Sequence, residues 1–134
     1  MKNLMRTALL AIVVLALVAD NLSADGPKGA CDKGKLRHVV LFKFKDTSSP
    51  EEIKKIEDAF RALPSKIPAI IDFEWGTNNS PEGLDQGFTH CFLVTFDDAE
   101  GRAEYLPHPA HKEFVEILKP HLDKVLVIDY VAKP

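Results

Sequence analysis

Three side chains in the last third of the sequence combine residue types and spacing that suit proton transfer. His108 and His111 flank the dipeptide Pro109-Ala110, and Tyr105 stands three residues before His108. Histidine is the side chain whose unperturbed pKa lets it accept and return a proton near neutral pH. A tyrosine hydroxyl can donate a hydrogen bond to a carbonyl or enolate oxygen. His111 and Tyr105 are therefore candidates for acid–base chemistry on a carbonyl compound.

Two more histidines fall in segments where apolar residues alternate with others, the pattern of a strand buried on one face. His38 lies in the segment 36–44 and His90 in the segment 88–96. Because these two strands are neighbours in the predicted sheet, we expect the imidazoles to approach each other. Together with aromatic residues of the same strand faces they would line an apolar ligand cavity. Those aromatic residues are Phe42, Phe88 and Phe92.

Each histidine also has a purely structural interpretation. A lone strand histidine is usually a hydrogen-bonded core residue, His108 can cap a helix, and His121 suits a helix C-terminus. Metal ligation by His108, His111 and a strand histidine is a further alternative. Pro109 displaces His108 from the helix, however, and no carboxylate or cysteine stands at a suitable spacing. We therefore predict neither a metal nor a cofactor.

The elements that must hold these residues follow from turn, cap and periodicity signals. Ser49, Pro50 and Glu52 make a helix start with a capping box, followed by one apolar stripe. Further helices are expected from Asp97–Asp98 to about residue 106 and from Pro109 to about residue 121. Short strands are expected at 70–75 and 125–131, and an exposed loop at 77–87. The order βαββαβ predicts an α+β, ferredoxin-like antiparallel sheet with helices on one face.

The predicted strands carry apolar residues on both faces. Val39, Leu41, Cys91 and Leu93 alternate with the aromatic set and so point away from the helices. A second copy of the same sheet is the simplest cover for this face, which predicts a homodimer. A half-solvated sheet with an apolar minority is the alternative.

The N-terminal 24 residues have the layout of a secretory signal peptide. Lys2 and Arg6 precede twelve apolar residues, 8–19, whereas a bilayer span takes roughly 20. We predict a signal peptide at 1–24, a flexible polar tail at 25–35 and one domain at 36–133. The mature protein would be secreted or periplasmic and would have no membrane contact. We expect Cys91 to be free and buried and Cys31 to be exposed in the tail, neither of them catalytic.

Composition excludes several classes of partner and reaction. A formal net charge of −3 provides no basic field for a phosphate backbone, so no nucleic-acid partner is expected. The sequence contains no Gly-rich phosphate loop, no Gly-x-Ser-x-Gly elbow and no paired-carboxylate motif. The partners that fit are a second copy of the chain and a small apolar ligand.

Five sequence blocks together resemble the stress-responsive A/B barrel (Dabb) domain family. They are Leu36–Lys45, Phe73–Gly76, Gly87–His90, Tyr105–His111 with its His-Pro-Ala-His segment, and Asp129–Tyr130. The resemblance covers residues 36–133, which is the whole predicted domain. It implies a ferredoxin-like protomer that dimerises through its sheet into an α/β barrel, in agreement with the independent prediction above.

The resemblance also implies alternatives for function. Many family members are known only as stress-associated proteins, whereas a plant member is a cyclase that closes a linear polyketide by an intramolecular aldol reaction. Matched by motif, that cyclase's base falls on His111 and its tyrosine on Tyr105, and its pocket histidines fall on His38 and His90. If this protein is an enzyme, the expected step is proton abstraction alpha to a carbonyl. A non-catalytic stress or structural protein, and a haem- or metal-dependent monooxygenase-like barrel, remain the alternatives.

Overall fold

The computed structural model describes residues 34–133, which form one sheet covered by helices. The chain runs through β1 (Leu36–Phe44), α1 (Pro50–Arg61), α2 (Leu63–Lys66), β2 (Asp72–Thr77), β3 (His90–Phe96), α3 (Ala99–Tyr105), α4 (Pro109–Leu118), a 3-10 turn η1 (Lys119–His121) and β4 (Leu122–Val131). The strand order is β2-β3-β1-β4, and every neighbouring pair is antiparallel. This confirms the predicted α+β ferredoxin-like fold. The predicted signal peptide at 1–24, Cys31 and most of the polar tail lie outside the described residues.

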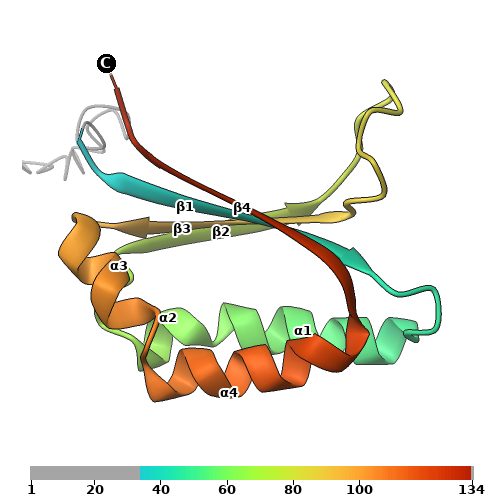
Figure 1. The fold of residues 1–134 in the computed structure, drawn as a ribbon, viewed down its shortest axis with the longest axis horizontal. Helices are drawn as coiled ribbons and strands as arrows, with labels where there is room; N and C mark the ends of the chain where they lie inside the picture. The colour runs from blue at the N-terminus through green and yellow to red at the C-terminus, as the bar shows by residue number, and fades with distance from the viewer. Residues whose placement is uncertain (1–33, 134) are drawn as a thin grey trace, which may run out of the picture.

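The helices pack on one face of the sheet (Figure 1). α1 and α4 run side by side beneath the strands, and α3 lies near one end of the sheet. Ser49 caps α1 through a reciprocal capping box with Glu52, as predicted. Asp98 caps α3 by accepting hydrogen bonds from the amides of Glu100 and Gly101. The two caps set where the covering helices begin.

The core lies between the sheet and the helices and is rich in aromatic rings. Phe42 and Phe92 are its centre on β1 and β3, with 1% and 0% of their surface exposed. Phe60 of α1 stacks on Phe92 with ring centroids 4.3 Å apart, and Phe114 of α4 lies 4.6 Å from Phe60. Aromatic rings packed in this way bury large apolar areas, and aliphatic residues such as Ile56 and Val94 complete the core.

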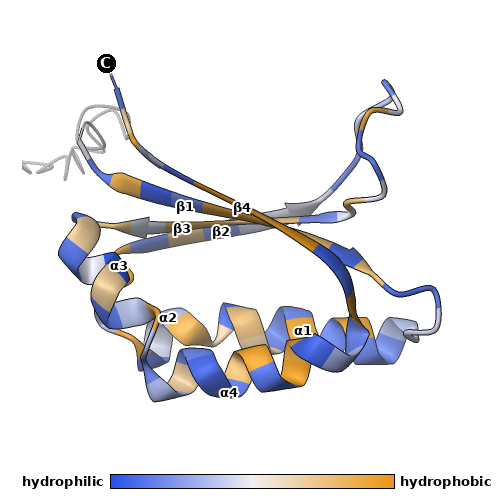
Figure 2. Ribbon diagram, in the orientation of Figure 1, coloured by the Kyte–Doolittle hydropathy of each residue, from blue (hydrophilic) through white to orange (hydrophobic). Residues whose placement is uncertain are grey.

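The opposite face of the sheet is not covered by any described helix (Figure 1). Leu126, Ile128 and Tyr130 of β4 are 41%, 49% and 48% exposed, and β4 is largely hydrophobic along its length (Figure 2). Cys91 forms no disulfide with any described residue and is exposed. The prediction that Cys91 is buried is therefore wrong for the single chain, because strand alternation places it on this uncovered outer face.

The observed boundaries differ from the predicted ones at three strands. β4 begins at Leu122, three residues earlier than expected. β2 begins at Asp72 and ends at Thr77, two residues later than expected at each end. β3 begins at His90 because Gly87, with a φ of 84°, and the preceding turn interrupt the alternation at Phe88. No helix within residues 34–133 is long and apolar enough to cross a membrane.

Candidate active site

An apolar cavity of about 340 Å³ lies between α4, β1 and β4. His38, Phe42, Tyr105 and His111, four of the residues predicted from sequence, line it together. Its remaining walls are mostly aliphatic or aromatic, and include Val40, Phe60, Phe114, Leu118, Val125 and Val127. A volume of this size with a few polar groups among apolar walls is typical of a small-molecule site.

Tyr105 and His111 face each other across the end of α3 and the start of α4. Their ring centroids lie 4.2 Å apart, and the Tyr105 ring meets the His38 ring edge-on at 5.7 Å. The His111 Nδ1 lies 3.0 Å from the carbonyl oxygen of Leu106. Because a carbonyl only accepts hydrogen bonds, Nδ1 carries the hydrogen, and Nε2 of neutral His111 keeps its lone pair. This is the tautomer that can accept a proton at Nε2.

His38 is held from the side of the sheet. Its Nδ1 lies 2.6 Å from Oδ1 of Asp129, the residue opposite it on β4. Oδ2 of Asp129 accepts a second hydrogen bond of 2.6 Å from Nη1 of Arg102 on α3. A carboxylate that accepts from an imidazole and a guanidinium at once fixes the orientation of the ring.

The three polar side chains His38, Tyr105 and His111, which line the cavity, each carry an atom without a hydrogen-bond partner among the described residues. No hydrogen bond among the described residues engages Nε2 of His38, Nε2 of His111 or the hydroxyl of Tyr105. No fully buried side-chain nitrogen or oxygen of the described residues lacks a hydrogen-bond partner. The three atoms are therefore open to the cavity, where a ligand oxygen or an acidic C–H could meet them.

Burial shifts the ionisation of two of these groups in directions that suit their geometry. Desolvation lowers the pKa of His111, and the nearby His38 and His108 lower it further against the opposing hydrogen bond to Leu106. Desolvation raises the pKa of Tyr105 well above its usual range, because the ring is 1% exposed. His111 therefore favours its neutral, proton-accepting form, and Tyr105 stays a hydrogen-bond donor at neutral pH.

His90 does not line this cavity and pairs with Phe42, further along β1 than His38. The expectation that His38 and His90 approach each other is wrong, because β1 and β3 are antiparallel. Their register pairs His90 with Phe42 and His38 with Val94. Four residues along a strand separate the two positions by about 13 Å.

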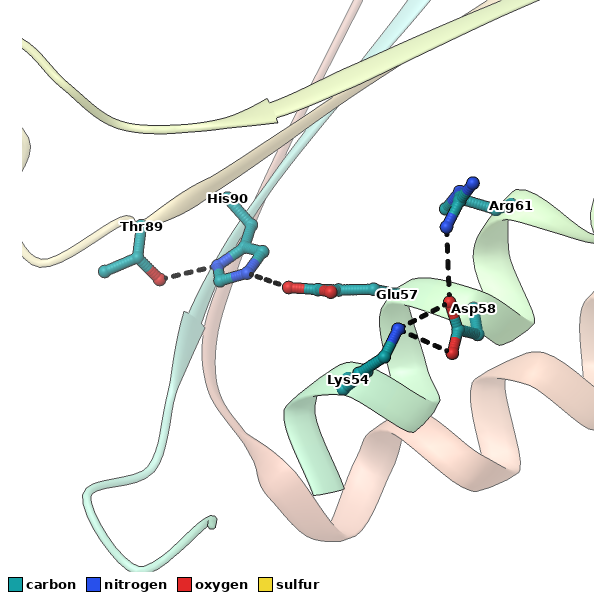
Figure 3. A network of polar contacts seen from close by, with 6 residues as sticks. All are labelled: Lys54, Glu57, Asp58, Arg61, Thr89 and His90. Atoms are coloured by element: carbon teal, nitrogen blue, oxygen red, sulfur yellow. Dashed lines mark hydrogen bonds and ion pairs between the residues drawn. The ribbon is translucent and has the colours of Figure 1, made fainter. Parts of the chain in front are cut away.

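The polar atoms of His90 are fully engaged. Nε2 lies 3.0 Å from Oε1 of Glu57 on α1, and Nδ1 lies 2.8 Å from the hydroxyl of Thr89 (Figure 3). The ring is 8% exposed, stacks nearly parallel to Trp75 at 6.4 Å and meets Phe44 edge-on at 5.0 Å. This environment matches the hydrogen-bonded core histidine of the structural interpretation.

Two predicted ligand-binding residues also lie elsewhere. Phe92 is fully buried in the ring stack behind the cavity wall and does not line it. Phe88 precedes β3 and lines a separate hollow on the outer face, with Leu41 and Cys91. The broken alternation at Gly87 turns Phe88 to that side.

The remaining histidines have structural contacts. Nδ1 of His108 accepts a hydrogen bond from the amide of Ala110 and caps α4, as the structural interpretation expected. Nδ1 of His121 lies 3.1 Å from the hydroxyl of Ser48. Within residues 34–133 no group of three or more histidine, cysteine, aspartate or glutamate side chains could hold a metal ion.

Sequence analysis missed three residues that hold the histidines. Glu57 stands four residues after Ile53 and three before Phe60, so it falls on the apolar stripe of α1, a signal that marks a carboxylate facing the core. Asp129 follows Val125 and Val127 at period two, so it faces the helices. Arg102 carried no comparable signal, because nothing in the sequence brings α3 beside β4.

The profile of the stress responsive A/B barrel domain family matches residues 36–132. The chain belongs to this family. It is 48% identical over 98 residues to the stress-response A/B barrel domain-containing protein HS1 of Arabidopsis thaliana, over 73% of this chain and 90% of HS1. It is 30% identical over 98 residues to olivetolic acid cyclase of Cannabis sativa, over 73% of this chain and 97% of the cyclase.

Solved structures of the family's fold agree with this assignment. The hydroxynitrile lyase of Passiflora edulis superposes with a TM-score of 0.71 at 26% identity, over 76% of this A/B barrel chain and 95% of the lyase. A dimeric protein of unknown function with a ferredoxin-like fold, from Bacteroides fragilis, superposes with a TM-score of 0.62 at 29% identity, over 75% and 98% of the two chains. Structural homologues of this chain are thus dimeric.

Proposed function

We propose that this A/B barrel protein binds a small, largely apolar carbonyl compound in the cavity beneath its sheet. The observation that carries the proposal is the convergence of three open polar atoms, from His38, Tyr105 and His111, in an otherwise apolar cavity of about 340 Å³. Apolar walls favour an apolar ligand, and the three polar atoms would orient its oxygen. If the bound compound reacts, these same atoms supply acid–base chemistry.

In the reaction that we propose, His111 abstracts a proton alpha to the ligand carbonyl through Nε2. The electrons of the broken C–H bond move onto the carbonyl oxygen, and the Tyr105 hydroxyl donates a hydrogen bond to the resulting enolate. His38 would orient the ligand through its own open nitrogen. The lowered pKa of His111 and the raised pKa of Tyr105 support these roles, because they keep the base neutral and the donor protonated near pH 7.

Two comparisons support an enzymatic role without identifying the substrate. A relative at 30% identity is named as a cyclase, and a structural neighbour at 26% identity is named as a lyase. A fold hosts many functions, so the substrate of either relative does not transfer to this chain. The support for chemistry comes from the open atoms of the cavity.

A second candidate is a non-catalytic role in stress resistance. The higher identity of 48% to the stress-response protein HS1, against 30% to the cyclase, favours it. In this case the cavity residues would serve packing, and their substitution would change stability but no ligand response.

The proposal includes a homodimer that is exported from the cell. Homologous structures are dimeric, and the outer face carries exposed Leu126, Ile128 and Tyr130 that a second copy would cover. Ile128→Glu should convert the dimer to a monomer in size-exclusion chromatography with light scattering, whereas the exposed helix residue Ile117→Glu should leave it intact. The export signal, 1–24, would be checked by sequencing the N-terminus of the mature protein.

The deciding experiment is a thermal-shift screen of residues 25–134 against aromatic and polyketide-like ketones and divalent metal ions. We expect at least one ketone to raise the melting temperature of the wild type and to lose this effect in His111→Ala. His121→Ala is the matched control, because His121 lies outside the cavity and should keep the response. If no compound of the panel raises the melting temperature of the wild type, and His111→Ala is merely less stable, the result favours the stress-protein alternative.

A further inference from the structure

Arg102 does not line the cavity, yet it contacts a residue that does. Its Nη1 lies 2.6 Å from Oδ2 of Asp129, and Oδ1 of the same carboxylate lies 2.6 Å from Nδ1 of His38. The contacts connect α3, β4 and β1 in one chain of charge-assisted hydrogen bonds. Arg102 is the outer member of this chain, with 30% of its side chain exposed.

We propose that Arg102 is a positioning residue that fixes the tautomer of His38 through Asp129. The role rests on the proposed function, in which His38 presents a nitrogen to the bound compound. A carboxylate only accepts hydrogen bonds, so the hydrogen in its contact with His38 belongs to Nδ1. In the neutral ring Nε2 is then the nitrogen with the lone pair, and no residue of the described chain engages it.

The position of Asp129 explains why a second partner is needed. Asp129 lies on β4, an edge strand of the described sheet, and its side chain is 29% exposed. Its helix-facing neighbour Val127 is 48% exposed, so little packing restricts the carboxylate. A carboxylate held by one hydrogen bond at such a site can rotate toward water. The guanidinium of Arg102 holds the second oxygen and thereby restricts the first to His38.

The contrast with another arginine of the protein provides a control. Arg61 on α1 contacts Asp58 at 3.3 Å, both side chains are about half exposed, and Asp58 contacts only residues of its own helix among the described hydrogen bonds. The Arg61–Asp58 pair is a surface contact with no histidine behind it. Its removal should therefore leave the His38 imidazole unchanged.

The test is an NMR measurement of the His38 ring in the unliganded dimer or monomer, whichever the wild type forms. With ¹⁵N-histidine labelling, under conditions in which the imidazole is neutral, we expect the hydrogen of His38 to reside on Nδ1, as a protected Nδ1–H signal. Arg102→Gln should lose this Nδ1–H signal or mix it with the Nε2–H form. Arg102→Lys, which keeps a positive charge for Asp129, should restore it in part, and Arg61→Gln should match the wild type.

A wild-type His38 signal in a folded Arg102→Gln would overturn the proposal, because this variant removes the Arg102–Asp129 ion pair and leaves the Asp129 carboxylate in place. If Arg102→Gln does not fold, as judged from its amide spectrum, Asp129→Asn tests the same ion pair, since its amide oxygen can still accept from Nδ1. The spectrum is recorded without ligand. If Arg102→Gln loses the His38 Nδ1–H signal while no compound of the thermal-shift screen stabilises the wild type, the ligand-binding proposal is refuted and the positioning role of Arg102 is still supported.

Discussion

The helices cover one face of the sheet, and a histidine lies near each end of this face in a different environment. His38 and His90 lie on neighbouring strands, and 6% and 8% of their surfaces are exposed. At the His38 end one ring nitrogen is bound and the other opens to a cavity. At the His90 end both nitrogens are bound and aromatic rings cover the faces. Burial alone therefore does not distinguish a site histidine from a core histidine; the number of engaged nitrogens does.

The covering helices account for the difference. At the His90 end α1 places Glu57 directly against the imidazole (Figure 3). At the His38 end Tyr105 of α3 meets the imidazole edge-on and Arg102 of α3 reaches it through Asp129, and neither binds the open nitrogen. We call these two regions the closed end and the open end. Substitutions at the closed end should change stability, and substitutions at the open end should change ligand binding.

The largest effect is expected from the ring stack of the closed end. Phe92 is fully buried between Phe60 and Trp75, with ring centroids at 4.3 and 5.6 Å. Phe92→Ala should lower the free energy of unfolding by about 3–5 kcal/mol, because it removes these contacts and leaves a cavity. Urea denaturation measures the loss. Val127→Ala at the open end should lower the free energy of unfolding by about 1 kcal/mol or less. Equal losses in Phe92→Ala and Val127→Ala would contradict the distinction between the two ends.

The next effect concerns the histidine of the closed end. His90→Leu should lower the free energy of unfolding by about 1–3 kcal/mol, because it leaves the half-buried Glu57 carboxylate without its partner. Glu57→Gln should cost less, since its amide oxygen can still accept from Nε2. Both values come from the same urea titrations. If His90→Leu leaves the free energy of unfolding unchanged, ring packing alone stabilises this end of the domain.

At the open end the predicted effect is on affinity. Tyr105→Phe removes a hydroxyl that makes no hydrogen bond with the described residues, so stability should change little. Affinity for a ketone found by the thermal-shift screen should fall by about 0.5–1.5 kcal/mol, or roughly 2- to 12-fold, through loss of one hydrogen bond. Isothermal titration calorimetry measures it. If Tyr105→Phe binds the ketone as tightly as the wild type but unfolds more easily, the role of Tyr105 is in packing and not in ligand binding.

The smallest effect is on pH dependence. The pKa of His111 is lower in the folded chain than in the unfolded chain, where it is about 6.5. As the pH falls below that value the unfolded chain binds the proton first, so the His111 contribution to stability is present at higher pH and is lost on acidification. Melting temperatures between pH 7.5 and 5 should therefore fall less in His111→Gln than in the wild type. An identical pH profile would show that His111 is solvated like an ordinary surface histidine.

Local signals predicted the fold well because they act over a few residues. The alternation at 36–44 and the caps Ser49 and Asp98 each depend on neighbours in the chain, and each is observed. The relative position of His38 and His90 depends instead on antiparallel register, which no local pattern specifies. Four of the seven predicted site residues meet in the cavity, and His90, Phe88 and Phe92 do not.

The same limit explains the partners that the sequence did not indicate. Glu57 and Asp129 stood at core-facing positions and were detectable as carboxylates within apolar stripes. Arg102 needed the approach of α3 to β4, a contact between segments 27 residues apart. Such contacts between distant segments follow from how the helices pack on the sheet. They decide which histidine keeps a ring nitrogen without a partner in the protein.

The aromatic environment of Trp75 makes the closed end visible by fluorescence. Trp75 is the single tryptophan of the sequence, and it stacks within 7° of the His90 ring and lies 6.0 Å from the Arg61 guanidinium. Its emission will thus report the unfolding of this end of the domain. Neither Trp75 nor these two neighbours line the cavity at the other end. We therefore expect intrinsic tryptophan emission to report folding with little response to occupancy of the cavity, so the two properties can be followed separately in one sample.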